Sequence, residues 1–278
     1  MTFSIVAWDP EAPSGPEWGV AVASKFLAVG AVVGWAEAHT GALATQALAN
    51  LAYGPEGLRR LGAGEGASEV VEALTAADEG SEHRQLGVVD ASGRSATFTG
   101  SECFAWAGGR TGDGYCCQGN ILTGPEVVDE MCRAFEATDG SLADRLIAAL
   151  AAGDAAGGDR RGRQSASVLV VREGGGYGGG IDTAVDLRVD DHPQPVDELS
   201  RLWELHRLYF PRADELEFVP LDEELRTELL ERLHALGHEG DFHDALYSWV
   251  GVENLEERLT DDKNVIERKI VEFLRRSR

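Results

Sequence analysis

Apolar and polar residues alternate along much of the chain in short runs of the kind that form β-strands. The first run begins directly behind Met1, and a second follows the turn-rich stretch DPEAPSGPE. A period of two residues places successive side chains on opposite faces of a strand. We therefore expect strands over residues 2–8, 18–26, 29–38, 40–49, 84–91, 94–100, 114–122, 165–171 and 184–190.

Stretches with helical periodicity separate these strands into groups. Two Gly-Pro-Glu triplets, at 54–56 and 124–126, are typical helix starts, because proline suits the first turn and glutamate is stabilised by the helix dipole. We expect helices from residue 54, over 67–77, from 124 to 135, over 141–152 and over 196–209. The order is four strands, two helices, three strands, two helices, two strands and one helix. It predicts an α+β fold, a four-layer αββα sandwich of two antiparallel sheets between helical layers.

Two parts of this region resemble each other. Gln46 and Asn50 precede the first Gly-Pro-Glu triplet, as Gln118 and Asn120 precede the second. We therefore expect each half to supply one sheet edge and one pair of helices.

The composition changes near residue 190, where charged residues become denser and follow helical spacing. The segment FPRADELEFVP, at 210–220, has two prolines and little periodicity, as expected for a boundary. We predict a sandwich domain over 1–210, a linker over 211–219 and a small all-helical domain over 220–278.

Charge and composition narrow the classes of function. The net charge of −23, from 25 basic and 48 acidic residues, argues against a nucleic acid partner. No apolar run is long enough to span a membrane and no secretory leader precedes the first strand, so we expect no membrane partner and a cytoplasmic location. The acidity leaves open a salty cytoplasm or a GC-rich genome. The four cysteines lack the CxxC spacing, and His234 and His238 lack further ligands, so we expect neither metal nor cofactor.

Thr2 is the first candidate for chemistry. Removal of Met1 would give Thr2 a free α-amine with a pKa of about 7.7–8.0, which could take the proton of its own hydroxyl. A strand that begins at once would hold such a nucleophile rigidly. Two alternatives stay open: Thr2 only begins a strand, or a buried water is the nucleophile because Met1 is retained.

Lys25 is the second candidate, through the expected hairpin. If Asp9 pairs with Trp18, Thr2 lies opposite Lys25, the only lysine among the first 262 residues. A cation there would keep the terminal amine neutral and stabilise an oxyanion. A slip of one residue would turn Lys25 to the other face.

The strand order and the TFSIVA…GVAVAS hairpin resemble those of the N-terminal-nucleophile (Ntn) hydrolases, the fold of proteasome β subunits. DRRGRQSASVLVV (159–171) is similar to their Asp-containing loop before a late strand. This resemblance implies that Asp159 supports the threonine, with Ser165 as a partner. Lys25 stands where proteasome subunits have Asp, and Gly162 where a supporting Ser is expected, so peptidase activity does not transfer.

A closer resemblance covers residues 1–210. The stretches MTFSIVA, GVAVASKFLAVGAVV, YGPEGL, QGNIL, GGDRRGRQSA and VDLRVDDHP identify the chain as a member of the family called domain of unknown function 1028. That family is grouped with the Ntn fold, and its reaction is not established. Residues 220–275 are similar to a helical domain labelled as peptidoglycan-binding, which implies a glycan contact. An acidic module without an export signal fits cell-wall contact poorly.

The remaining candidates surround this centre. Gln118 and Asn120 end a strand before a helix start, where Asn120 would hold an oxyanion or simply close a turn. Arg160, Arg161 and Arg163 would clamp a substrate carboxylate or pair with the acidic surface.

The sequence thus predicts a hydrolase of a small or medium amide that forms homo-oligomers. The alternative is a non-catalytic protein that binds a ligand or partner through the same fold, with a relation to the cell wall through its C-terminal domain. The residues expected to be catalytic are Thr2, Lys25, Asn120 and Asp159, and those expected to bind substrate are Gln118, Arg160, Arg161, Arg163 and Ser165.

Overall fold

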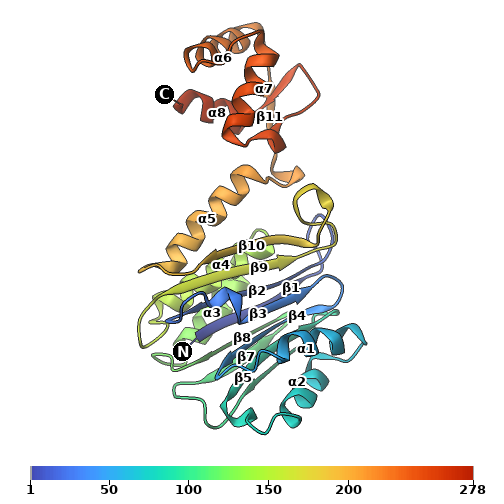
Figure 1. Cartoon of the computed structure of the whole chain (residues 1–278), viewed down its shortest axis with the longest axis vertical. Coiled ribbons are helices and arrows are strands. Elements are labelled where there is room, and N and C mark those ends of the chain that lie inside the picture. The colour runs from blue at the N-terminus through green and yellow to red at the C-terminus, as the bar shows by residue number, and fades with distance from the viewer. Residues whose placement is uncertain (1, 278) are drawn as a thin grey trace. The chain divides into compact units, whose positions relative to one another are not determined.

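The computed structural model describes residues 2–277 (Figure 1). The chain divides into two compact units, Met1–Leu202 and Trp203–Arg278, and the division falls within helix α5 (Pro195–Tyr209). No helix within the described residues is both long enough and apolar enough to cross a membrane.

The first unit contains a six-stranded antiparallel sheet in the order β10-β9-β2-β1-β8-β7. Strand β1 lies between β2 and β8, so Thr2, its first residue, has a neighbouring strand on both sides. The strands are β1 (Thr2–Asp9), β2 (Glu17–Ser24), β7 (Gly108–Gly112), β8 (Tyr115–Asn120), β9 (Ser165–Val171) and β10 (Thr183–Val189).

A four-stranded sheet, β3-β4-β5-β6, faces the larger one through contacts of β4 with β1 and of β5 with β8. Helices α1 and α2 cover its outer face, and α3 and α4 cover the outer face of the six-stranded sheet (Figure 1). The layers confirm the predicted αββα sandwich. The elements are β3 (Gly34–Glu37), β4 (Gly41–Ala47), β5 (Arg84–Asp90), β6 (Ser95–Thr99), α1 (Tyr53–Gly62), α2 (Ala67–Ala76), α3 (Glu126–Ala137) and α4 (Leu142–Ala155).

Alternation along β1 decides which residues face which layer. Phe3 lies against Gly153 of α4, on the helical side of the sheet. Val6 packs with Val20 and Val22 of β2 in the core between the sheets. Because successive side chains point to opposite faces, Thr2 shares the face of Val6 and is directed between the two sheets.

Two strand predictions need correction. The structure has four strands between the two helix pairs, not three, because residues 108–112 form β7 at the edge of the sheet. Their sequence, GGRTG, carries no apolar alternation that could predict a strand. The run 29–38 forms only the short strand β3, since a 3-10 turn occupies Val29–Ala31.

The second unit packs three helices around its own apolar core, which includes Leu229, Trp249 and Ile270. A two-stranded ribbon joins them, so the expected all-helical domain is mainly but not entirely helical. Strands of three residues are too short for a period of two to be visible in the sequence. The elements are β11 (Phe218–Pro220), α6 (Glu223–Ala235), α7 (Phe242–Glu253), β12 (Val265–Glu267) and α8 (Arg268–Arg276).

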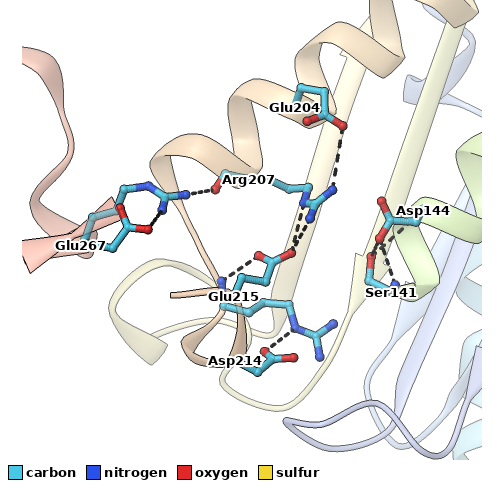
Figure 2. A network of polar contacts seen from close by, with 9 residues as sticks. Ser141, Asp144, Glu204, Arg207, Asp214, Glu215 and Glu267 are labelled. Carbon is cyan, nitrogen blue, oxygen red and sulfur yellow. Dashed lines mark hydrogen bonds and ion pairs between the residues drawn. The ribbon is translucent and has the colours of Figure 1, made fainter. Parts of the chain in front are cut away.

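A buried ion pair holds this unit together. Arg258 and Glu267 are each 1% exposed, and the Nη1 and Oε1 atoms that face each other are 3.1 Å apart. The same guanidinium donates to the Arg207 carbonyl at 2.7 Å (Figure 2) and to the Leu208 carbonyl at 2.6 Å. Glu267 accepts from the Ile270 amide at the start of α8. The pair of Arg258 and Glu267 thus connects the end of α5, strand β12 and α8. A buried charge needs such a full set of partners.

Removing one member of this pair leaves the other charge buried and alone. We expect Arg258→Met to destabilise the second unit by about 3–5 kcal/mol. The matched control is Arg275→Met, since Arg275 pairs with Glu228 at an exposed position, where solvent screens the ion pair and its loss should cost much less. Urea denaturation measures both, followed by hydrogen exchange of the backbone amides in the core around Trp249, and equal losses would contradict this role for Arg258.

Candidate active site

Four buried polar side chains form a row across the six-stranded sheet. Thr2 pairs with Ser24 of β2 on one side and with Asn120 of β8 on the other, and Ser24 pairs in turn with Ser165 of β9. Directly opposite residues of antiparallel strands share a face, so all four are directed between the sheets. The Oγ1 atom of Thr2 lies 3.1 Å from the Oγ atom of Ser24, a hydrogen-bond distance. We call these residues the polar row.

The register of the first hairpin corrects the prediction for Lys25. Thr2 pairs with Ser24, not Lys25, and Asp9 pairs with Glu17, not Trp18. Glu17 is buried at the start of β2 and accepts a hydrogen bond from Arg172 at 2.5 Å, which extends the strand by one residue. The expected register would also turn the valines of β2 from the core between the sheets to the helical side.

Lys25 itself lies just beyond β2, away from the position opposite Thr2. Its side chain is exposed, and its Nζ atom donates to the Arg163 carbonyl at 3.3 Å. Its backbone N–H donates to the Asp159 carboxylate at 2.7 Å. The structure therefore supplies no cation opposite Thr2 through this residue.

Asp159 acts on the polar row through the backbone. Its side chain is almost fully buried and accepts hydrogen bonds from the amides of Lys25, at 2.7 Å, and Arg161, at 2.8 Å. Because Lys25 follows Ser24 directly, this carboxylate fixes the end of β2 where Ser24 meets Thr2.

Ser165 holds the segment that follows β2. Its hydroxyl donates to the carbonyl of Phe26 at 2.5 Å and accepts from the amide of Val29 at 3.1 Å. These two bonds close the loop between Phe26 and Val29 against the start of β9. Both Phe26 and Val29 line the cavity described below.

The three predicted arginines lie elsewhere. Arg163 pairs with Asp154 at 2.7 Å, and Arg161 with Asp159 at 3.3 Å. Arg160 is exposed, and its backbone N–H donates to the Ile121 carbonyl. None of the three belongs to the described lining of the cavity beside Thr2.

Three glutamines and a serine support the row from the core. The Ser4 hydroxyl donates to Gln46 of β4 at 2.7 Å and accepts from Gln118 of β8, also at 2.7 Å. Gln46 donates to Gln85 of β5 at 2.8 Å, and the same Gln85 oxygen accepts from Asn120 at 3.0 Å. We call Ser4, Gln46, Gln85 and Gln118 the amide cluster. It ties the two sheets together directly behind Thr2, and each of its members is at most 1% exposed.

Sequence reasoning missed most of this support. Gln118 was expected at the substrate, whereas the structure buries it under the row. The resemblance between the segments around Gln46 and Gln118 was a usable signal, because both glutamines bond to Ser4. Nothing in the run RQLGVV distinguishes Gln85 from an ordinary strand residue, and nothing predicts Ser24 once Lys25 is placed opposite Thr2.

A cavity of about 370 Å³ opens in front of the row. Its described lining includes three polar side chains, those of Thr2, Gln46 and Arg84. The other lining residues are Phe26, Val29, Val32, Val33, Ala47, Leu48, Ala49 and Leu51. The volume is typical of small-molecule sites, so Thr2 lies where a bound ligand would contact it.

Arg84 is held in the cavity wall by Asp78. The Nε atom of Arg84 donates to Asp78 at 3.0 Å and its Nη1 atom to the Leu48 carbonyl at 2.6 Å. Asp78 also accepts from Asn50 and Tyr53. The Arg84 hydrogen bond is the largest cause that holds the pKa of Asp78 well below its usual range. Burial, followed by the hydrogen bond to Asp78, raises the pKa of Tyr53.

No group of three or more His, Cys, Asp or Glu side chains within residues 2–277 is arranged to hold a metal ion.

Comparisons with known proteins match both parts of the chain. A family model described as "Family of unknown function (DUF1028)" matches residues 2–199, and one described as "Putative peptidoglycan binding domain" matches residues 209–274. The chain is similar to a crystal structure of a DUF1028 protein from Silicibacter pomeroyi, with 35% identity and a TM-score of 0.67. The alignment covers 74% of this chain and 86% of that one. No curated protein matches the chain.

A glycine of β5 makes room for the amide cluster. A Cβ atom on Gly87 would lie 2.1 Å from Oε1 of Gln118, a buried oxygen with no hydrogen-bond partner among the described residues. We expect Gly87→Ala to displace Gln118 from Ser4 and to cost about 1–3 kcal/mol. Gly180→Ala is the control, because nothing lies within 4 Å of its Cβ position. Urea denaturation compares the two variants, and a neutral Gly87→Ala would show that the cluster tolerates displacement.

The ion pair behind the cavity makes stability depend on pH. Asp78 has a lowered pKa in the folded protein, so its negative charge stabilises the fold when the pH is above the unfolded-state pKa of about 3.9. That stabilisation is lost as the pH falls toward and through the folded-state pKa of Asp78. We expect Asp78→Asn to be destabilised at pH 7 relative to the parent, and the difference to shrink toward pH 2.

Free energies of unfolding measured in urea from pH 7 to pH 2 check this expectation. Glu72→Gln, at an exposed position of α2, is the control and should show no such convergence. A difference between parent and Asp78→Asn that stays constant with pH would contradict the role of the charge.

Proposed function

This chain belongs to the family of unknown function DUF1028, and we propose that it is an amidohydrolase whose nucleophile is the Thr2 hydroxyl. One observation carries the proposal. Thr2 begins a central strand, lines a cavity of ligand size and lies 3.1 Å from the Ser24 hydroxyl. A hydroxyl in that position is both held and accessible to a bound molecule. The substrate class is a small or medium amide.

The chemistry needs a free α-amine on Thr2. Met1 lies outside the described residues, and we propose that it is removed. The amine, with a reference pKa near 8, then takes the hydroxyl proton while Oγ1 bonds to the carbonyl carbon. The carbonyl electron pair moves onto oxygen and returns as the C–N bond breaks, and the leaving amine takes the proton from the ammonium. Water then hydrolyses the threonyl ester by the same route.

The neighbours of Thr2 have distinct parts in this proposal. Ser24 orients Oγ1 by a hydrogen bond, and Asn120, whose Nδ2 atom donates to Gln85 at 3.0 Å, has a second N–H for the oxyanion. Asp159 and Ser165 are positioning residues, since they hold the end of β2 and the loop after it. Lys25 has no part in it, because it does not lie opposite Thr2.

The match over residues 209–274 favours a second activity, glycan binding through the second unit. Helix α7 exposes the aromatic ring of Tyr247, and such a ring can pack on the apolar face of a sugar. A protein with only this activity would retain its glycan but would not react with an amide-directed electrophile at Thr2.

Replacing the nucleophile tests the enzyme directly. We expect Thr2→Ala to lower the turnover of any amide that the parent hydrolyses by about 1,000-fold or more, because both half-reactions pass through Oγ1. Thr2→Ser should retain part of the activity, and Ser24→Ala should lose less than Thr2→Ala.

Two measurements by mass spectrometry accompany the kinetics. The intact mass of the parent should show a chain that begins at Thr2, and a β-lactone should leave an adduct on that residue. Unchanged turnover by Thr2→Ala, in a protein whose parent has lost Met1, would exclude this mechanism.

A further inference from the structure

The lining of the cavity beside Thr2 is mainly apolar, which indicates the chemical class of its ligand. Eight of the eleven described lining residues are aliphatic or aromatic. Three of these apolar residues are large and well exposed, with Phe26 at 52%, Leu48 at 60% and Leu51 at 46%. Single exposed apolar residues are common on protein surfaces, whereas several around one cavity mark a surface that is covered by a ligand.

The electrostatics of the same cavity argue against a charged ligand. Arg84 is the only charged residue in its described lining, and Asp78 neutralises that guanidinium at a distance of 3.0 Å. No carboxylate belongs to the described lining, although the chain carries a net charge of −23. Arg84 already donates to Asp78 and to the Leu48 carbonyl, so an ionic group held among the apolar side chains would lose its hydration without gaining an unpaired side-chain charge.

The chemistry of a threonyl ester indicates which part of the substrate the cavity holds. The amine portion leaves after the first step, whereas the acyl portion stays bonded to Oγ1 until water releases it. A cavity that includes Thr2 in its wall is therefore suited to the acyl group. At about 370 Å³ it lies at the lower end of the range for small-molecule sites, so it fits a medium alkyl chain or one aromatic ring.

We propose that the substrates are amides of uncharged, apolar acyl groups, with the acyl chain bound among Phe26, Leu48 and Leu51. This assignment rests on the proposed function, because it takes Oγ1 of Thr2 as the atom to which the acyl group becomes bonded. It excludes acidic acyl groups and sugars as the group held in this cavity.

A series of acyl p-nitroanilides tests the assignment. Acetyl, butyryl and hexanoyl p-nitroanilide differ in apolar length, and in succinyl p-nitroanilide a carboxylate replaces the terminal methyl group of the butyryl chain. We expect kcat/KM to rise up to about fourfold for each buried methylene, and the succinyl compound to fall at least tenfold below the butyryl one. A flat series, or a preference for the succinyl compound, would overturn the proposal.

Variants of the exposed lining residues test whether the effect on acyl length belongs to this cavity or to the protein surface in general. Leu48→Ser and Phe26→Ser change exposed side chains, and each should lower kcat/KM for the hexanoyl compound about tenfold with little effect on the acetyl one. Ile181→Ser is the matched control, because Ile181 is as exposed as Leu48 and lies outside the described lining. Equal effects of all three variants on kcat/KM would show that Phe26 and Leu48 do not bind the acyl group.

A binding measurement keeps this test distinct from that of the reaction. Titration calorimetry of Thr2→Ala with hexananilide, acetanilide and N-hexylacetamide needs no turnover. If hexananilide binds at least tenfold more tightly than the other two, the acyl assignment stands even when the parent shows no hydrolysis, and only the reaction fails. If N-hexylacetamide binds best, the cavity takes the amine side, and if none is preferred, the apolar class is wrong.

Discussion

The whole site depends on the register between β1 and its two neighbours. Side chains alternate with a period of two, so a shift of one residue would turn the polar row toward the helices and the valines away from the core. Burial of each such valine contributes about 1.5–3 kcal/mol, and Val6, Val20 and Val22 all lie between the sheets. Apolar packing farther along the same strands thus fixes Thr2 opposite Ser24 and Asn120.

This dependence explains what could be predicted from the sequence. Strands and helices follow from local alternation, and their grouping predicts the sandwich. The register does not follow, because the loop over residues 10–16 could have been one residue longer without changing the strand pattern. The register depends on contacts between segments far apart in the sequence, namely the valine packing between the sheets and the ion pair of Glu17 with Arg172. The edge strand at 108–112 could not be predicted for another reason, since its sequence GGRTG has no alternation of apolar and polar residues.

The site shows the same division between local and distant information. Thr2, Asn120 and Ser165 could be found because each lies at the end of a strand of the larger sheet, and Asp159 because the loop before β9 resembles a loop of a known fold. Gln85 and Arg84 come from the smaller sheet, and only the packing of the two sheets brings them near Thr2. Gln46 lies between these cases, since its sequence context resembles that of Gln118 but does not reveal that both contact Ser4.

The amide cluster is a costly feature for a protein core. A buried amide costs about 1–3 kcal/mol for each group left without a hydrogen bond, and the Gln118 oxygen has no partner among the described residues. Apolar side chains of similar volume would avoid that cost. What they could not do is hold the Thr2 carbonyl, which Gln46 contacts at 3.4 Å, or bind Asn120. Most of these amide groups lie behind Thr2, where they fix the backbone, whereas eight of the eleven described lining residues of the cavity beside it are apolar. The Thr2 hydroxyl is thus held from behind by hydrogen-bonded groups and meets mainly aliphatic and aromatic side chains on its open side.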